Sequence, residues 1–464
     1  MKDFIDDSKI ESILDRAARP ERPQIEEIIA KAGELKGLTP EDTAVLLQTE
    51  DRELIGMIRQ TARKIKQAIY GNRLVLFAPM YIANHCSNDC LYCGFRRSNK
   101  ELTRVALTME QIENEVRVLE REGHKRLLML CGEHPNRSSL DYFVEAIDTA
   151  YAVKTEKGGE IRRINVEIAP LTVPEFRRLK ETRIGTYVLF QETYHHGTYT
   201  RMHPSGPKAD FAWRVTAMHR AQEGGISDVG IGALFGLYDY RYEVLGLLSH
   251  ARQLEKDCGV GPHTISIPRL QPAMNAPAAI TPPCPVRDEE FKTLVAILRL
   301  AVPYTGMILT TRESPEMRNE VFNLGVSQIS AGSRTDPGGY EKDSSERFRA
   351  AQFNLGDTRT PDEVIHDITL MGHIPSFCTA CYRLGRVGKD FMDLAKPGLI
   401  QKFCRVNAIM TFKEYLLDYA SPQTRMAGEK LLERLVVETK GAGTRRTVTT
   451  RLAQLESGQR DLYV

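Results

Sequence analysis

Short apolar runs alternate with amphipathic stretches between residues 73 and 333, and this alternation constrains the fold more than any other feature. The amphipathic stretches carry apolar residues at helical spacing, so each is predicted to join one strand to the next. Strand–helix alternation implies parallel strands connected by right-handed crossovers. The eight runs are 73–82, 126–132, 163–170, 186–193, 227–236, 263–270, 306–313 and 326–333. Eight strands favour an α/β fold of the closed (β/α)8 barrel type over the alternative, a doubly wound open sheet.

Both flanks of this region are predicted to be helical. The N-terminal flank carries apolar residues at helical spacing, with Thr39 and Pro40 as the start signal of one helix. The stretch RTDPGGYEKDSSE at 334–346 has the composition of a linker. The chain is therefore predicted to contain a helical N-terminal extension (1–70), the barrel (71–340) and a mostly helical C-terminal domain (341–464).

The composition is that of a soluble globular protein, with 42% hydrophobic and 27% charged residues. The net charge of +2 gives no reason to expect nucleic acid or an anionic membrane as a partner. No apolar run approaches the ~18–20 residues that span a bilayer, and the acidic start MKDFIDDSKIES lacks the features of a signal peptide. We therefore expect a cytoplasmic protein, in which closely spaced cysteines serve as metal ligands or catalysts rather than as disulfides.

Polar residues and glycines gather where the predicted strands end, and barrel enzymes build their active sites at the carboxyl ends of their strands. The residues that follow this pattern are Cys86, Cys90, Cys93, Gly132, Glu133, Glu167, Glu192, Gly232, Arg269, Arg312, Ser330 and Ser333. His263 is the exception, because it opens the sixth run. Scattered polar residues would not be expected to align in this way, so we predict the active site at this end of the barrel.

A first cysteine triplet, Cys86-x3-Cys90-x2-Cys93, follows the first predicted strand. Iron–sulfur clusters are held by cysteine thiolates. Three thiolates leave one iron of a four-iron cubane without a protein ligand, and that iron is then free to bind a small molecule. Two alternatives remain open at this point: a zinc site and three unrelated buried cysteines.

A second triplet, Cys378-x2-Cys381-x22-Cys404, lies in the predicted C-terminal domain. It again offers three thiolates, so the same reasoning applies to it. The alternative is a zinc site that a nearby histidine, His366 or His373, would complete.

The first triplet resembles the signature of radical S-adenosylmethionine (SAM) enzymes, with Tyr92 as the aromatic residue before the last cysteine. The resemblance implies a 4Fe-4S cluster whose open iron binds the amino and carboxylate groups of SAM. It also implies reductive cleavage of SAM to methionine and a 5′-deoxyadenosyl radical.

Other segments are similar to the SAM-binding motifs of the same family. Gly132 and Glu133 resemble the motif for the SAM amino group, and Glu167 matches a carboxylate that holds the ribose hydroxyls. Arg214 is similar in placement to the arginine that pairs with the SAM carboxylate. Gly232, in VGIGALFG, resembles the glycine motif whose backbone approaches the adenine. Each motif is weak alone, and their joint position at strand ends makes the resemblance specific.

A wider resemblance runs from about residue 70 to the end of the chain. The segments VLFQETYH, VGIGALFGLYDYR, PHTISIPRL and SAGS are similar to the tyrosine-cleaving branch of radical SAM enzymes. This branch contains the 2-iminoacetate synthases of thiazole biosynthesis and the maturation proteins of iron-only hydrogenases. The C-terminal Cx2Cx22C spacing is similar to the second group, so the resemblance implies an auxiliary 4Fe-4S cluster at Cys378, Cys381 and Cys404.

The implied reaction cleaves L-tyrosine to p-cresol and dehydroglycine. Dehydroglycine is then converted into carbon monoxide and cyanide on an additional labile iron, which leaves for assembly of the hydrogenase active site (the H-cluster). The family holds that iron through a free cysteine and a histidine, which matches His263. The resemblance also implies a reductant protein such as flavodoxin or ferredoxin, and other hydrogenase maturation proteins, as partners.

For the tyrosine carboxylate, a planar guanidinium that binds both oxygens is the best partner. Arg312 is the first choice and Arg269 the second, with Ser330 and Ser333 as hydrogen-bond partners. Two other functions remain alternatives. One is a 2-iminoacetate synthase whose C-terminal triplet is structural, and the other is a zinc-stabilised scaffold for cluster assembly.

Overall fold

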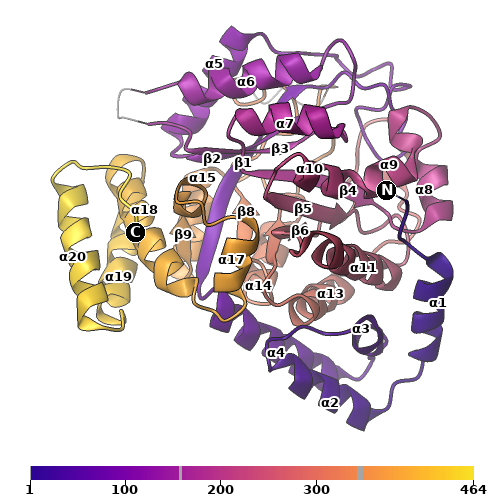
Figure 1. Ribbon diagram of the computed structural model, residues 1–464. Helices are drawn as coiled ribbons and strands as arrows, with labels where there is room; N and C mark the ends of the chain where they lie inside the picture. The colour runs from indigo at the N-terminus through magenta and orange to yellow at the C-terminus, as the bar shows by residue number, and fades with distance from the viewer. Residues whose placement is uncertain (1, 156–158, 342–348) are drawn as a thin grey trace.

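The computed structural model describes residues 2–155, 159–341 and 349–464. Eight parallel strands close into a barrel in the order of the chain, because β1 pairs with both β2 and β8 (Figure 1). This confirms the predicted barrel and excludes the open sheet. The strands are β1 (Arg73–Ala83), β2 (Arg126–Cys131), β3 (Arg163–Glu167), β4 (Thr186–Glu192), β5 (Asp228–Ala233), β6 (Thr264–Ser266), β7 (Gly306–Leu309) and β8 (Gln328–Ser330).

A ring of helices covers the outside of the barrel. Helix starts are set locally: Thr108 and Gln111, for example, form a reciprocal capping box at the start of α5. The crossover helices are α5 (Met109–Arg121), α6 (Leu140–Ala152), α7 (Val173–Glu181), α10 (Ala217–Glu223), α11 (Tyr240–Cys258), α13 (Asp288–Ala301) and α14 (Pro315–Phe322). Three further short helices lie in the loops of the barrel: α8 (His196–Met202), α9 (Phe211–Val215) and α12 (Pro277–Ile280). The main core lies between the barrel strands and this ring.

The N-terminal extension adds four helices against one side of the ring. They are α1 (Asp7–Arg16), α2 (Arg22–Ala32), α3 (Pro40–Leu47) and α4 (Arg52–Ile69). Helix α4 packs on α13, while α1 and α3 pack on α11. Helix α3 begins as predicted, with Pro40 in its first turn and a capping box between Thr39 and Asp42.

Within its described residues, 349–464, the C-terminal region contributes six helices and one strand that the sequence pattern did not indicate. The helices are α15 (Pro361–Leu370), α16 (Ala380–Arg383), α17 (Gly388–Ala395), α18 (Gln401–Asp418), α19 (Pro422–Val437) and α20 (Ala442–Glu456), and the strand is β9 (Ile374–Ser376). Strand β9 pairs with the first residues of β1, so this region joins the barrel sheet (Figure 1). Residues 342–346 of the predicted linker lie outside the described part of the chain.

Strands β9 and β2 pair with the same edge of β1, β9 with its first residues and β2 with its later ones. Val75 pairs with Ser376 of β9 on one edge and with Gln328 of β8 on the opposite edge. Pairing with β2 begins only at Ala78, opposite Leu127. The chain therefore leaves β9 at the gap before β2 begins, and Cys378 follows directly.

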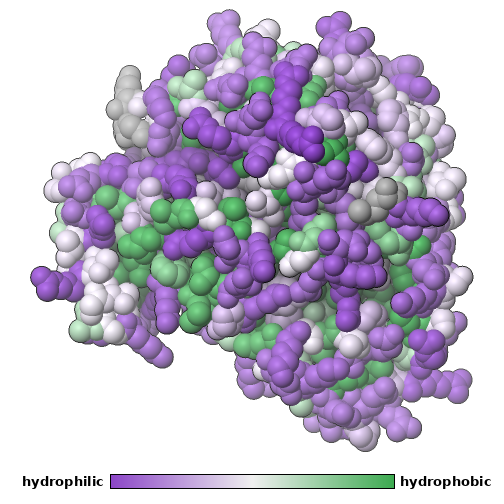
Figure 2. Space-filling model, in the orientation of Figure 1, coloured by the Kyte–Doolittle hydropathy of each residue, from purple (hydrophilic) through white to green (hydrophobic). Residues whose placement is uncertain are grey.

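The surface drawn in Figure 2 is mostly hydrophilic, with apolar areas on and beside the C-terminal helices. Exposed large apolar residues of that region include Leu384, Leu399, Met426 and Val437. None of the helices in the described ranges is long and apolar enough to cross a bilayer.

Candidate functional site

The first cysteine triplet lies at the carboxyl end of the barrel, in the loop after β1. Cys86, Cys90 and Cys93 line one cavity. Asp89 holds the loop in shape, because its carboxylate accepts hydrogen bonds from Arg96 Nε at 3.0 Å and Ser98 Oγ at 2.7 Å. The loop thus presents three sulfur atoms to a common space.

The three thiols fit an iron–sulfur cluster better than a single metal ion. Asn88 Nδ2 lies 3.7 Å from Cys86 Sγ and Gln352 Nε2 lies 3.6 Å from Cys93 Sγ, and N–H groups that face sulfur tune such clusters. A mononuclear zinc site requires ligands that converge on one point. No three His, Cys, Asp or Glu side chains do so within residues 2–155, 159–341 and 349–464.

Burial keeps two of these thiols, Cys90 and Cys93, protonated until a metal binds. It raises the pKa of Cys90 to about 12 and that of Cys93 to about 11, because a thiolate is disfavoured away from water. A metal centre stabilises the thiolate instead, so cluster binding releases the protons.

The predicted SAM-binding residues surround the same cavity, with one exception. Gly132 lies so close to the cysteine loop that an added Cβ would sit 2.4 Å from the His85 carbonyl oxygen, so glycine is required there. Glu133 accepts a hydrogen bond from Asn88 at 2.6 Å, and Glu167 and Arg214 also line the cavity. Gly232 lies in β5 beside the Phe190 ring and outside this lining, so its adenine role stays a prediction.

Tyr92 and Arg214 are held by polar partners rather than by packing alone. Tyr92 Oη lies 2.7 Å from His203 Nε2. Arg214 Nε donates to the Phe190 carbonyl oxygen at 2.7 Å, and its Nη2 lies 3.8 Å from Glu192 Oε1. The terminal guanidinium nitrogens of Arg214 therefore stay near a carboxylate at the cavity wall.

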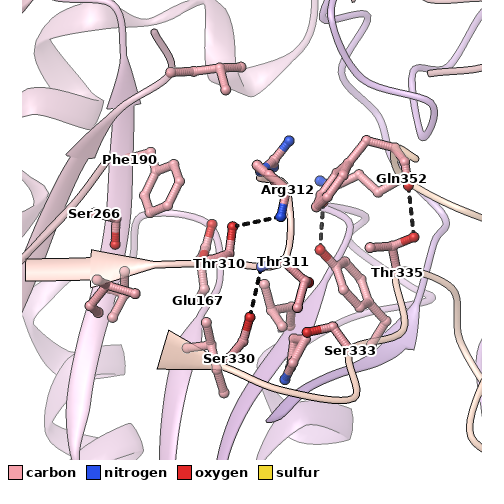
Figure 3. Close-up of a pocket in the computed structure, with 18 of the residues that line it drawn as sticks. Glu167, Phe190, Ser266, Thr310, Thr311, Arg312, Ser330, Ser333, Thr335 and Gln352 are labelled. Atoms are coloured by element: carbon pink, nitrogen blue, oxygen red, sulfur yellow. Dashed lines mark hydrogen bonds between the residues drawn. The ribbon is translucent and has the colours of Figure 1, made fainter. Parts of the chain in front are cut away.

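A second, more apolar cavity, drawn in Figure 3, shares part of its lining with the first. Tyr92, Cys93, Glu167 and Glu192 line both cavities. Burial and the neighbouring Glu192 raise the pKa of Glu167 to about 7. Figure 3 shows Glu167, Arg312, Ser330 and Ser333 around this cavity.

Arg312 is free to bind a ligand in this cavity. Its guanidinium stacks 3.3 Å from the centre of the Phe353 ring, and no ion pair holds it among the described residues. Ser330 Oγ accepts a hydrogen bond from the Thr311 backbone at 3.1 Å, whereas Ser333 Oγ is buried without a partner. Arg312, Ser330 and Ser333, three of the predicted substrate-binding residues, are thus brought together.

Arg269 is not brought to this cavity. Its guanidinium pairs with the buried carboxylate of Glu313, with Nε at 3.0 Å from Oε1, and with Asp288 at 2.7 Å. Since both carboxylates already neutralise it, Arg269 has no free donor pair for a substrate carboxylate.

The second cysteine triplet lies at the opposite end of the barrel. Cys378, Cys381, Cys404 and His263 line one cavity together with the first residues of β1, β2 and β5, which are Arg73, Arg126 and Asp228. The starts of parallel strands all lie at the amino end of the barrel, so this cavity is at the end opposite the first triplet. His263 Nδ1 lies 3.5 Å from Asp228 Oδ1. A hydrogen bond between Cys381 and Cys404 raises the pKa of Cys381 and lowers that of Cys404 to about 6, which shows that the two sulfurs are adjacent.

The histidines of the zinc alternative do not share this cavity. His373 Nδ1 lies 3.2 Å from the Asn72 carbonyl oxygen, and burial lowers the pKa of His373 to about 4. Neither His366 nor His373 belongs to the described residues that line the cavity, whereas His263 does. Gln328 in β8 lines both this cavity and the one that holds Arg312, so only the barrel interior separates the two ends.

Comparison with known proteins agrees with this geometry. Residues 80–247 match the model of the radical SAM superfamily, and residues 266–374 match the biotin and thiamin synthesis associated domain. The 2-iminoacetate synthase of Escherichia coli (strain K12) is 31% identical over 353 residues, which is 76% of this chain and 90% of that protein. The crystal structure of HydG, a maturase of the FeFe-hydrogenase, superimposes with a TM-score of 0.96 at 50% identity and covers 100% of both chains. The chain belongs to the HydG group of the radical SAM superfamily.

A second HydG structure, from Carboxydothermus hydrogenoformans, has a TM-score of 0.84 at 40% identity over 96% of this chain and 97% of that one. Membership of the radical SAM superfamily implies a 4Fe-4S cluster and SAM, and the first cysteine site of this radical SAM protein fits both.

Several residues of the two sites escaped the sequence pattern. They are Asn88, His203, Lys208 and Gln352 at the first site, and Arg73, Arg126 and Asp228 at the second. Arg73, Arg126 and Asp228 are the first residues of their strands, and a search of strand starts as well as strand ends would have found them. Gln352 lies beyond the barrel, in a segment without periodic signal, so only the folded chain shows its place.

Proposed function

We propose that this radical SAM protein cleaves L-tyrosine to p-cresol and dehydroglycine and then converts dehydroglycine into carbon monoxide and cyanide. The two ligands are built on an iron that leaves for assembly of a hydrogenase active site. One observation carries the proposal: two three-cysteine sites lie at opposite ends of one barrel, and Gln328 faces both cavities.

At the first site, Cys86, Cys90 and Cys93 hold the 4Fe-4S cluster, and Gly132, Glu133, Glu167 and Arg214 surround SAM. The cluster and SAM, when bound there, would supply the radical chemistry for hydrogen-atom abstraction from the amino group of tyrosine. Arg312 binds the tyrosine carboxylate, and Ser330 and Ser333 line the same cavity as hydrogen-bond partners for it. The apolar walls, such as Phe77 and Leu130, keep water from the reacting bond.

At the second site, Cys378, Cys381 and Cys404 hold an auxiliary 4Fe-4S cluster, and His263 with a free cysteine holds the labile iron that is the substrate here. The Nδ1 atom of His263 faces Asp228, which leaves Nε2 for the iron. Dehydroglycine reaches this site through the barrel interior. A flavodoxin or ferredoxin supplies electrons in the cytoplasm, and other hydrogenase maturation proteins receive the iron product.

Separable loss of the two steps tests the proposal. We expect Cys86→Ala to abolish p-cresol formation, because no radical is then generated. We expect the double variant Cys378→Ala, Cys381→Ala to form p-cresol while losing carbon monoxide and cyanide, measured in anaerobic assays with a chemical reductant. Loss of all tyrosine turnover in the double variant would contradict the division of labour. About one zinc and no labile sulfide in the purified protein would instead support a scaffold.

A second candidate is a 2-iminoacetate synthase, which the 31% identity to the Escherichia coli enzyme favours. In that case the C-terminal triplet is structural. Formation of p-cresol without carbon monoxide or cyanide, with both clusters intact by electron paramagnetic resonance (EPR), would support it over the first proposal.

A further inference from the structure

The cavity of the second cysteine triplet carries more positive charge than the cysteines need. Three arginines line it, Arg73, Arg126 and Arg386, against the single carboxylate of Asp228. A cubane core of about +2 held by three thiolates carries about one net negative charge. One positive charge therefore remains unbalanced in a buried cavity, where unpaired charge is costly.

Arg73 is the least satisfied of the three. It is the first residue of β1, its Nε is buried without a hydrogen-bond partner, and no ion pair or hydrogen bond engages its guanidinium within the described part of the chain. A guanidinium is protonated at any physiological pH, so the side chain carries its charge into the cavity. A half-buried guanidinium whose Nε is buried without a protein partner calls for an explanation, and a bound anion supplies one.

Arg126 completes a pair with Arg73. It is the first residue of β2, only 4% exposed, and its Nε is also buried without a partner. Tyr382 Oη accepts one hydrogen bond from its Nη2 at 2.7 Å, which orients the guanidinium. Arg386, by contrast, is occupied by the Val464 carbonyl oxygen at 2.9 Å. Arg73 and Arg126 are thus the two donors left for a ligand.

The gap between β9 and β2 brings these two arginines to the cysteines. Strand β9 ends opposite Val75 and pairing with β2 begins at Ala78, so the chain that carries Cys378 leaves the sheet between Arg73 and Arg126 along β1. Gln328, which faces both ends of the barrel, lines the same cavity. A ligand that arrives through the barrel interior would enter the cavity that this pair lines together with the cysteines.

We propose that Arg73 and Arg126 form a carboxylate-binding site for a small α-imino or α-amino acid beside the second cluster. The proposal rests on the proposed function and names the residues that hold the substrate there. Two sources present this chemistry: dehydroglycine, a two-carbon imino acid with one carboxylate, and the free cysteine that holds the labile iron. A guanidinium fork binds both oxygens of such a carboxylate.

The test compares reconstituted holoenzyme with Arg73→Gln, Arg126→Gln and the matched control Arg163→Gln. Arg163 begins the neighbouring strand β3 and stacks 4.2 Å from the Tyr382 ring, but it lines an outer groove instead of the cysteine cavity. Dehydroglycine that escapes adds one water and yields glyoxylate and ammonia. Cyanide, p-cresol and glyoxylate are measured together, with iron content and the EPR spectrum of the second cluster.

We expect the ratio of cyanide to p-cresol to fall about tenfold in both site variants and glyoxylate to rise in its place. The Arg163→Gln protein should keep the ratio of the unmodified protein. In a second arm, L-cysteine is titrated into reduced holoenzyme while the EPR spectrum of the second cluster is followed. A raised cysteine midpoint without extra glyoxylate assigns the pair to free cysteine, and extra glyoxylate with an unchanged midpoint assigns it to dehydroglycine.

Full iron content with an unchanged ratio and an unchanged cysteine midpoint in both variants would overturn the proposal, because the arginines would then only balance the cluster charge. If the glutamine variants lose the second cluster, Arg126→Lys decides, since it keeps the charge without the fork. A ratio and midpoint equal to those of the unmodified protein would again overturn the site. If the unmodified protein makes p-cresol but no cyanide, the proposed function fails, and the L-cysteine titration still decides the carboxylate site.

Discussion

At the scale of single residues, buried charges without partners separate functional positions from structural ones. Arg269 and Arg318 are buried arginines with carboxylate partners, Glu313 and Asp357. Arg312 lacks such a partner in the part of the chain that the structure describes, and it faces a cavity. The difference follows from desolvation, since a guanidinium away from water must be compensated by the protein or by a ligand.

Arg312 gives the first prediction. Arg312→Lys should raise the KM for tyrosine about tenfold, because an ammonium cannot bind both carboxylate oxygens. The measurement is p-cresol formation against tyrosine concentration. Arg269→Lys, which keeps the pairing with Glu313, is the control and should leave KM within about twofold. A larger KM change for Arg269→Lys than for Arg312→Lys would reverse the assignment.

Lys66 gives the second prediction. Its Nζ is buried without a hydrogen-bond partner in α4, and burial, with Arg299 and Arg73 nearby, lowers its pKa to about 7. Because the unfolded chain still binds this proton between pH 7 and about 10.5, the free energy of unfolding rises with pH across that window. Lys66→Met should therefore raise the thermal midpoint by about 2–5 °C at pH 6.

The gain from Lys66→Met should shrink as the pH approaches 10, where the folded protein no longer carries the charge. Lys64→Met, an exposed position on the same helix, is the control and should leave the midpoint nearly unchanged. An equal gain at pH 6 and pH 10 would show that packing, and not the buried charge, is responsible.

At the scale of elements, β9 and α17 attach the second cysteine site to the barrel. Strand β9 pairs with β1 immediately before Cys378. The Gly388 amide at the start of α17 donates to Asp228 Oδ1 at 2.7 Å, and Asp228 also faces His263. The position of the C-terminal helices therefore depends on groups at the starts of β1 and β5.

Gly388 gives the third prediction. Its φ of +54° disfavours other residues, and an added Cβ would lie 3.0 Å from the Ser227 carbonyl oxygen. Gly388→Ala should cost about 1–2 kcal/mol and displace the start of α17. We expect less iron at the second site and an unchanged EPR signal of the first cluster.

Gly385→Ala is the matched control for Gly388→Ala, because Gly385 also has a positive φ of +70° but an added Cβ there meets no atom within 4 Å. It should lower second-site iron less than Gly388→Ala does. Equal losses would mean that backbone conformation, and not the contact with Ser227, matters.

At the scale of the whole molecule, hydrogen bonds hold the start of the N-terminal extension against the outside of the barrel. Asp7 in α1 accepts hydrogen bonds from Tyr242 Oη at 2.5 Å and lies 2.7 Å from His196 Nδ1. Asp3 lies 2.6 Å from His196 Nε2. The His-rich stretch after β4 thus helps to hold α1 through His196.

This cluster gives the fourth prediction. Burial opposes charge on both groups, but hydrogen bonds to Tyr242 and His196 lower the pKa of Asp7, and hydrogen bonds to Asp3 and Asp7 raise that of His196. The His196 contribution is complete below about pH 6.5 and is lost as the pH rises through its folded pKa; the Asp7 contribution is lost as the pH falls below about 4.

Asp7→Asn should therefore lower the free energy of unfolding more at pH 6 than at pH 8, with a difference of about 1 kcal/mol after solvent screening. The thermal midpoint at the two pH values measures this difference. Asp15→Asn, at an exposed position of α1, is the control and should lower it by the same small amount at both pH values. A larger effect at pH 8 than at pH 6 would contradict the assigned pKa directions.

Local patterns were enough to predict the barrel and to mark several residues that line its cavities. Eight strands, their order and the cysteine spacings depend on residues near each other in the chain, where periodicity and turn chemistry are readable. Strand β9 escaped because it has three residues, one of them Pro375, and its pairing with β1 spans the whole barrel. Arg269 was wrongly predicted to bind the substrate carboxylate, because its partner Glu313 lies 44 residues away in the chain and no local pattern indicates the pairing.

By itself, the sequence determined the barrel, the two cysteine triplets and the strand ends that carry Glu167 and Arg312, because each depends on short-range spacing. Only the tertiary structure decided that the triplets occupy opposite ends of one barrel and that Asp228 faces His263 at the second. It also decided which guanidinium groups keep a buried Nε without a hydrogen-bond partner, those of Arg73 and Arg126 among them. The physical reason is that burial and ion pairing are set by contacts between distant segments, which no local pattern encodes.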